Sequence, residues 1–212
     1  MSLTLFGREI KSGETAKFRA QISEMNDGTP VYISLIVVAG VQEGPTVLLS
    51  GAIHGDEYNG PASIPRICRE VTPDMLKGNI IGVPVMSPFS FFTRSRSNTL
   101  DYEHLNLNRI WPGLEDGYLT QKAAHVVFEN VVKKADYVLD FHEGGIAIIA
   151  EYLGIGGSES AKAAIGETQR NMARWFGQGV PVIEKTTDNN QIALGRLGTM
   201  TEAAAALGKP TL

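Results

Sequence analysis

Two short and almost continuously apolar segments constrain the fold of this chain more than any other feature of its sequence. Residues 46–53 read TVLLSGAI, and residues 137–141 read YVLDF. Runs of this length are typical of strands that are covered on both faces. We therefore expect both segments to be buried strands of one sheet, the first of them in a central position.

Helical patterns separate the two strands and follow them. A helix is expected to begin near residues 57–61 and a second one to span residues 118–134, because apolar side chains recur there at helical spacing. The first of these helices buries one face, made of Ile64, Ile67, Cys68 and Val71. The other expected elements are strands over residues 79–85 and 181–183 and helices over residues 159–176 and 199–207, the last stopped by Gly208. This order predicts an α/β architecture.

A β segment is expected ahead of the first apolar strand, over residues 1–40. Residues 15–23 alternate polar and apolar side chains, and a β-rich run over residues 31–39 follows the turn sequence NDGTP at residues 26–30. We interpret the two runs as an antiparallel pair.

Two further segments lack a regular pattern. Residues 86–117 show neither helical nor strand periodicity, and an irregular stretch of this length inside a compact domain usually serves function. The sequence GIGGS at residues 154–158 lacks the Lys-Ser/Thr ending of a P-loop. We interpret it as a flexible turn before a helix, without a role in phosphate binding.

Composition excludes several classes of protein. The chain has 212 residues, a size that one large domain can fill, and a formal net charge of −4 with no run of basic residues, so nucleic acid is not an expected partner. Its apolar runs are far shorter than the roughly 18–20 residues that cross a bilayer, and its N-terminus lacks a secretory pattern. We expect a cytoplasmic protein without a membrane partner, in which the single cysteine, Cys68, forms no internal disulfide.

Acidic and histidine side chains occur at the ends of both apolar strands. His54 and Glu57 follow the first strand, and His142 follows the second. Because the carboxyl ends of parallel strands meet at one edge of a sheet, these residues can converge there. Two imidazoles and one carboxylate are the ligand set of a catalytic zinc site. The alternative is that each motif is only a solvated turn.

The irregular segment offers a second group of polar residues. Asn108 and Arg109 suit a substrate with a free carboxylate, because arginine binds a carboxylate through two parallel hydrogen bonds. A surface salt bridge is the alternative for Arg109. Of the remaining histidines, His125 falls in an expected helix as a packed or surface residue, and His104 has no partner at ligand spacing.

Taken together, His54-Gly55-Asp56-Glu57, Leu107-Asn108-Arg109 and Asp140-Phe141-His142 resemble the motifs of the succinylglutamate desuccinylase/aspartoacylase family. The resemblance implies a zinc carboxypeptidase-like domain over residues 1–212, with a mixed, mostly parallel central sheet and helices on both faces. It implies that His54, Glu57 and His142 bind Zn²⁺ and that Asn108 and Arg109 hold the substrate carboxylate. It also implies an arginine near the scissile carbonyl, for which Arg96 is the better match and Arg94 the rival.

One departure from the family pattern concerns the catalytic glutamate. In the family this residue follows a Gly-x-Pro turn, which Gly208-Lys209-Pro210 resembles, and it would lie beyond Leu212. The chain is therefore expected to be truncated at its C-terminal end and impaired in activity. Glu143 is a poor substitute, because strand neighbours point to opposite faces. Asp140 shares the face of His142 and either orients that imidazole or is a strand-end carboxylate without a metal role.

The sequence thus predicts a zinc-dependent hydrolase that cleaves the amide bond of a small N-acyl amino acid. Two alternatives remain open. A metallocarboxypeptidase would use the same metal and the same carboxylate-binding pair, and a non-catalytic metal- or carboxylate-binding module would need no glutamate. A homo-oligomer is possible.

Overall fold

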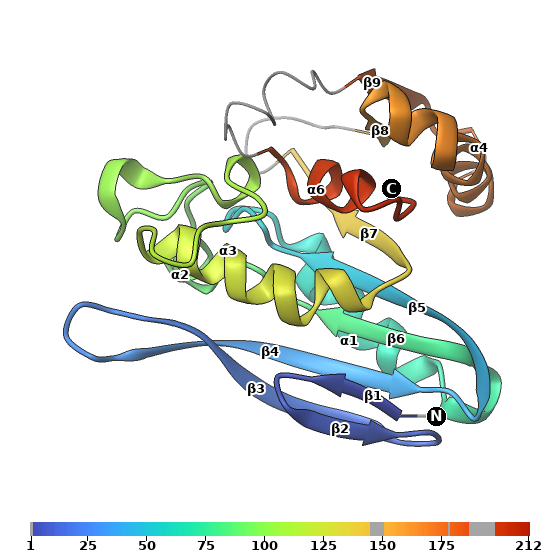
Figure 1. The fold of residues 1–212 in the computed structure, drawn as a ribbon, viewed down its shortest axis with the longest axis horizontal. Helices are drawn as coiled ribbons and strands as arrows, with labels where there is room; N and C mark the ends of the chain where they lie inside the picture. The colour runs from blue at the N-terminus through green and yellow to red at the C-terminus, as the bar shows by residue number, and fades with distance from the viewer. Residues whose placement is uncertain (1, 145–150, 178, 187–197) are drawn as a thin grey trace.

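The centre of the computed structural model is a five-stranded sheet (Figure 1). The structure describes residues 2–144, 151–177, 179–186 and 198–212. In spatial order the strands are β3 (Thr15–Glu24), β4 (Pro30–Ala39), β6 (Lys77–Val83), β5 (Gln42–Gly51) and β7 (Tyr137–Phe141). The expected central position of the first apolar strand is confirmed, because β5 lies between β6 and β7.

The sheet is mixed rather than mostly parallel. β3 pairs with β4, and β4 with β6, in the antiparallel sense, whereas β5 runs parallel to both β6 and β7. The expected antiparallel pair at the N-terminal side is confirmed, but the expected excess of parallel pairs is not. The reason is that the β3–β4 hairpin joins the sheet through β4 beside β6, and apolar periodicity contains no information about strand direction.

Helices cover both faces of the sheet, as Figure 1 shows. α1 (Asn59–Glu70) contributes Ile64 to one apolar core, which also contains Leu49 of β5. α3 (Leu119–Asn130) packs into the core on the other face, which contains Leu48. Successive strand residues point to opposite faces, so β5 is covered on both sides as its sequence predicts. Within the described residues, no helix is long and apolar enough to span a membrane.

Short elements complete the N-terminal and middle parts of the chain. A two-stranded hairpin precedes the sheet, and single helical turns occupy the connections. These elements are β1 (Ser2–Leu5), β2 (Arg8–Lys11), η1 (Pro73–Met75), α2 (Pro88–Phe92), η2 (Tyr102–His104), η3 (Leu107–Arg109) and η4 (Val132–Lys134). The segment over residues 86–117 therefore has the irregular character that its sequence predicts.

A smaller unit lies beyond β7 in Figure 1. It contains β8 (Leu153–Gly157), α4 (Glu159–Phe176), β9 (Val182–Thr186) and α6 (Met200–Ala206), with β8 and β9 paired in parallel. The interpretation of residues 154–158 as a flexible turn is wrong, because residues 154–157 belong to β8. Glycine content suggested a turn, but pairing with β9 supplies the hydrogen bonds that hold this run extended.

The last three residues lie beside β7. Val138 and Thr211 form a parallel bridge, and the Leu212 backbone exchanges hydrogen bonds with Val138 and Asp140. Buried Gln169 of α4 donates to the Thr211 hydroxyl and to the Gly156 carbonyl oxygen, both at 3.0 Å. The C-terminal segment is thereby fixed to both the main sheet and the smaller unit.

Cys68 is buried on α1 against the sheet, and we expect its thiol to be unreactive in the folded chain. Burial raises the pKa of this thiol to about 11, so little reactive thiolate is present near pH 8. A chromogenic disulfide reagent should label the chain only after denaturant unfolds it. Rapid labelling without denaturant would contradict the packing of α1 on the sheet.

Candidate metal centre

The loop between β5 and α1 is folded tightly against the segment around α2. Ala52 follows β5 in the left-handed region, with a φ of 46°, and is fully buried. The Gly55 backbone N–H donates to the Ser95 carbonyl oxygen at 2.9 Å. A Cβ atom on Gly55 would lie 1.8 Å from the Ser90 carbonyl oxygen, so this position needs glycine. These contacts fix the backbone that carries His54 and Glu57.

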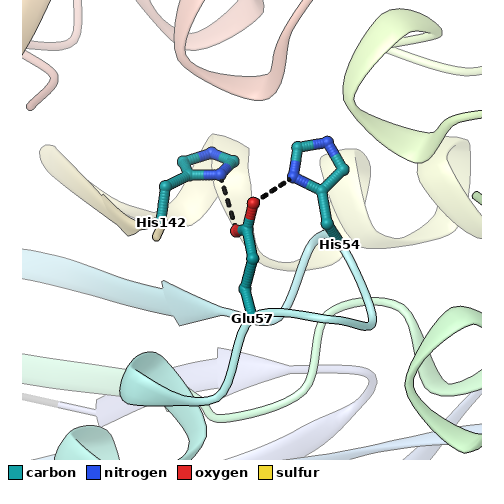
Figure 2. A group of neighbouring side chains, drawn as sticks. All are labelled: His54, Glu57 and His142. Atoms are coloured by element: carbon teal, nitrogen blue, oxygen red, sulfur yellow. Dashed lines mark hydrogen bonds and ion pairs between the residues drawn. The ribbon is translucent and has the colours of Figure 1, made fainter. Parts of the chain in front are cut away.

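Three side chains from two strand ends converge on one point (Figure 2). His54 Nδ1 lies 2.8 Å from Glu57 Oε1, and His142 Nδ1 lies 2.9 Å from Glu57 Oε2. The potential ligand atoms of the three residues all lie within 4.8 Å of one another. His54 and Glu57 are buried, whereas the His142 side chain is 35% exposed. The convergence that the strand-end motifs predict is therefore present.

Charge at this centre is arranged to favour a cation. Burial alone would raise the pKa of Glu57, but the hydrogen bonds and charges of His142 and His54 lower it to about 2. Burial would lower the pKa of His142, but Asp140 and Glu57 raise it to about 10. The Glu57 carboxylate is thus ionised near neutral pH and stabilises positive charge beside it.

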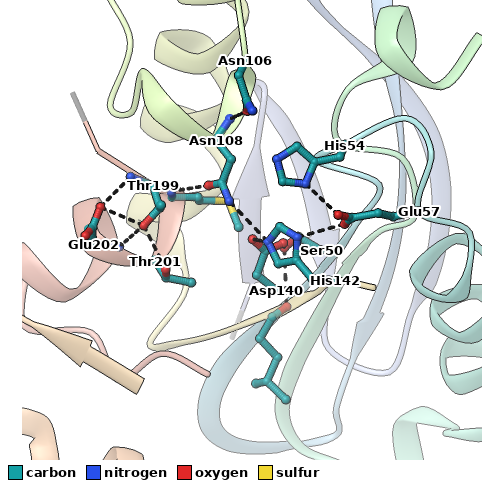
Figure 3. A network of polar contacts seen from close by, with 12 residues as sticks. Ser50, His54, Glu57, Asn106, Asn108, Asp140, His142, Thr199, Thr201 and Glu202 are labelled. Atoms are coloured by element: carbon teal, nitrogen blue, oxygen red, sulfur yellow. Dashed lines mark hydrogen bonds and ion pairs between the residues drawn. The ribbon is translucent and has the colours of Figure 1, made fainter. Parts of the chain in front are cut away.

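Asp140 holds the far side of the His142 ring (Figure 3). His142 Nε2 lies 2.9 Å from Asp140 Oδ2, and the Ser50 hydroxyl donates to Asp140 Oδ1 at 2.6 Å. Ser50 is fully buried on β5, so Asp140 is itself held by the sheet. This arrangement turns Nδ1 of His142 toward Glu57 and His54.

Asn108 and Arg109 lie on η3 beside the three converging residues. The Asn108 side chain is buried, with Oδ1 accepting from the Met200 backbone N–H at 3.1 Å and Nδ2 lying 3.3 Å from His142 Nε2. Arg109 Nη1 donates to the Asn108 carbonyl oxygen at 2.6 Å. The sequence did not predict that Asn108 connects the start of α6 to the centre.

The two candidate arginines of the preceding loop differ in position. Arg96 Nη1 donates to Glu57 Oε1 at 3.2 Å, and its side chain is 51% exposed. Arg94 is exposed, has a φ of 52° and is not among the residues that line the cavity at the centre. Of the two, Arg96 alone reaches the centre.

A cavity of about 630 Å³ opens over these residues. His54, Glu57 and His142 line one side of it, together with Arg96, Asn108 and Arg109. Aromatic side chains from the smaller unit and the end of β7 line another side; they are Phe141, Tyr152 and Phe176. His104, which has no partner at ligand spacing in the sequence, and His125, which lies in α3, do not line this cavity.

The profile of the succinylglutamate desuccinylase/aspartoacylase catalytic domain matches residues 43–212. The chain belongs to this family. The match covers β5 through the C-terminal segment, and so includes every residue of the centre described above.

Individual proteins resemble the chain over different lengths. The N-alpha-acetyl-L-2,4-diaminobutyric acid deacetylase of Halomonas elongata is 38% identical over 103 residues, which are 49% of this chain and 30% of that protein. The crystal structure of a succinylglutamate desuccinylase/aspartoacylase from Rhodobacter sphaeroides has a TM-score of 0.74 at 26% identity, covering 93% of this chain and 56% of that one. The product-bound ectoine utilization protein EutE (DoeB) from Ruegeria pomeroyi gives the same TM-score and identity, covering 95% and 60%. The chain thus spans less than two thirds of the length of these relatives.

The donor set of this family member fits a divalent cation. Two imidazole nitrogens and one carboxylate converge, and three protein donors leave coordination positions for water and substrate, as in catalytic zinc sites. His54 Nε2 is buried and lacks a hydrogen-bond partner among the described residues. Within the described part of the chain, the contact of its Nδ1 with Glu57 is the polar contact that fixes the ring.

Glu143 is a residue of the centre whose contacts sequence reasoning missed. Its carboxylate accepts the Tyr58 backbone N–H at 2.6 Å and the Asn59 backbone N–H at 3.2 Å. Contacts to backbone N–H groups cannot be predicted from residue types, so only the position of Glu143 beside His142 in the sequence could have indicated that Glu143 belongs to the centre.

Proposed function

We propose that the chain contains the catalytic centre of a zinc-dependent deacylase that hydrolyses the amide bond of an N-acyl amino acid, in a zinc carboxypeptidase-like domain spanning residues 1–212. The observation that carries this proposal is the convergence of His54, Glu57 and His142 at the wall of a cavity that also presents Arg109. Membership of the desuccinylase/aspartoacylase family supports the reaction class. The deacetylase relative supports an N-acetyl amino acid as the first substrate to test.

Each member of the converging group has a part in holding the metal. His54 and His142 would bind Zn²⁺ through Nδ1, and Glu57 through its carboxylate. Bound zinc would acidify a water molecule and polarise the scissile carbonyl. Asp140 would accept a hydrogen bond from the His142 Nε2–H group, which leaves Nδ1 to the metal and raises its basicity.

Substrate would lie between the metal centre and η3. Arg109 offers a planar guanidinium at the cavity wall, and the Asn108 Oδ1 contact with Met200 leaves Nδ2, which lies 3.3 Å from His142 Nε2, as the donor of that side chain. We assign the substrate carboxylate to this pair. Arg96, next to Glu57, is placed to stabilise charge on the scissile carbonyl oxygen.

Proton transfer requires a carboxylate other than those that would hold the metal or orient its ligands. Four carboxylates of the described chain line the cavity, and each already accepts hydrogen bonds; they are Glu57, Asp140, Glu143 and Glu202. We therefore propose that the described residues alone support only slow turnover.

A hydrolysis assay with metal removal tests the proposed function. The zinc-loaded chain is expected to release free amine from an N-acetyl or N-succinyl amino acid, to lose this activity after dialysis against a chelator and to regain it when zinc is restored. Turnover that persists after chelation would contradict the proposal. Release of the C-terminal residue of a peptide would favour a metallocarboxypeptidase, and binding without turnover a non-catalytic module.

A further inference from the structure

Glu143 connects the two segments that carry the converging side chains. It directly follows His142, and its carboxylate accepts the backbone N–H groups of Tyr58 and Asn59, which directly follow Glu57. Asn59 and Tyr58 lie 84 and 85 positions before Glu143 in the chain. No function assigned above uses this contact.

The start of α1 needs an acceptor that its own sequence does not supply. The N-cap residue, Tyr58, makes no side-chain capping bond, and the first turn contains no acidic residue. The first backbone N–H groups of a helix have no partner within the helix, and its N-terminus carries a partial positive charge. The Glu143 carboxylate satisfies both requirements from another part of the fold.

The Glu143 contact also lies beyond the point where pairing between β5 and β7 ends. Backbone pairing between β5 and β7 ends at Gly51 and Phe141. The sheet therefore does not connect the two segments that follow these strands. Glu57 and His142 both lie in these segments. The Glu143 contact is thus a second connection between the two segments, in addition to the contact of His142 with Glu57.

We propose that Glu143 is a positioning residue for the metal centre: by binding the start of α1, it sets the separation of the segments that present Glu57 and His142. This inference rests on the metal site of the proposed function. Both Glu143 oxygens are engaged by backbone donors, so its role is to hold ligands in place rather than to transfer a proton. Asp140 orients the ring of His142, and Glu143 fixes the backbone that carries it.

Zinc affinity, measured by competition with a chromophoric chelator, tests this role. Glu143→Ala is expected to weaken zinc binding by about 10- to 100-fold, the usual loss when a residue that supports a ligand is removed. Glu143→Gln keeps one acceptor oxygen for the shorter bond, to Tyr58, so its loss is expected to be intermediate. The visible spectrum of the Co²⁺-substituted chain should change in Glu143→Ala, since the ligand geometry changes.

A matched control separates positioning from helix stability. Glu70 lies at the other end of α1, where its exposed carboxylate bonds Arg66 at 2.8 Å. Glu70→Ala therefore perturbs the same helix without touching the connection, and its zinc affinity is expected to stay within about twofold of the unaltered chain. Thermal unfolding of the metal-free variants reports how far each change destabilises the fold.

Three results would overturn the proposal. Wild-type zinc affinity in Glu143→Ala, even with a lower unfolding temperature, would make the contact a helix cap alone. Unchanged zinc affinity with lost turnover would make Glu143 a proton-transfer residue. Failure of the unaltered chain to bind zinc would remove the metal site itself, and with it both the proposed function and this role.

Discussion

Replacing His54 with alanine is expected to abolish measurable zinc binding and the chelator-sensitive hydrolysis that depends on it. His54 is 1% exposed, and its Nδ1 is one of three donors at the centre. Its removal leaves one imidazole and one carboxylate, a set that no longer matches a catalytic zinc site. The loss of affinity should exceed the about 10- to 100-fold that removal of a supporting residue costs.

The measurement is a chelator competition titration of the purified variant. His125→Ala is the matched control, because it removes another histidine from the same chain but at a position on α3 away from the cavity. That control should retain the zinc affinity of the unaltered chain. Equal affinity in all three chains would show that the bound metal lies elsewhere, and the assignment of His54, Glu57 and His142 would be wrong.

The convergence of these side chains could be predicted because the end of an apolar run in the sequence indicates the end of a buried strand. His54 and His142 follow two such runs, and these become β5 and β7, which are adjacent and parallel. Parallel neighbours end at the same edge, so two histidines far apart in sequence meet. The two histidines meet because both strands are parallel members of one sheet, whatever the order of the other strands and the course of the loops.

The direction of the strands and the long-range polar contacts could not be predicted from the sequence in this way. The β3–β4 hairpin makes the sheet mixed, because alternation of apolar residues is the same in parallel and antiparallel strands. The sequence indicated a substrate-binding role for Asn108, but it gave no sign that the Asn108 Oδ1 accepts from the Met200 backbone N–H, 92 residues away. Such contacts depend on where backbone donors lie after folding, which residue types alone do not reveal.

The glycines of the chain also show that tertiary contacts, rather than local sequence, can decide the conformation or the identity of a residue. Residues 154–158 suggested a turn by composition, yet residues 154–157 form most of β8, where pairing with β9 holds them extended. Gly55 gave no comparable signal, although the packing of its loop admits no other residue. What decides its identity is the approach of the Ser90 backbone, 35 residues later in the chain.

Gly55→Ala is therefore expected to destabilise the chain strongly and to disturb the centre at the same time. The new Cβ would lie 1.8 Å from the Ser90 carbonyl oxygen, 1.9 Å from the Ser90 carbonyl carbon and 2.4 Å from the Phe91 backbone nitrogen. These are backbone atoms that cannot rotate away, so the loop or α2 has to move. We expect a loss of about 3 kcal/mol in the free energy of unfolding, the upper end for overpacked sites.

Urea unfolding of the metal-free chain measures this loss, and Gly166→Ala supplies a control of opposite sign. Gly166 lies inside α4, where an added Cβ meets the end of the flexible Arg170 side chain at 3.4 Å. Alanine should stabilise that helix by about 0.5–1 kcal/mol. Because Gly55 lies between His54 and Glu57, its variant should also bind zinc more weakly than the Gly166 variant. If Gly55→Ala unfolds like the unaltered chain, the loop does not pack on Ser90, and the contacts that fix His54 and Glu57 must be sought elsewhere.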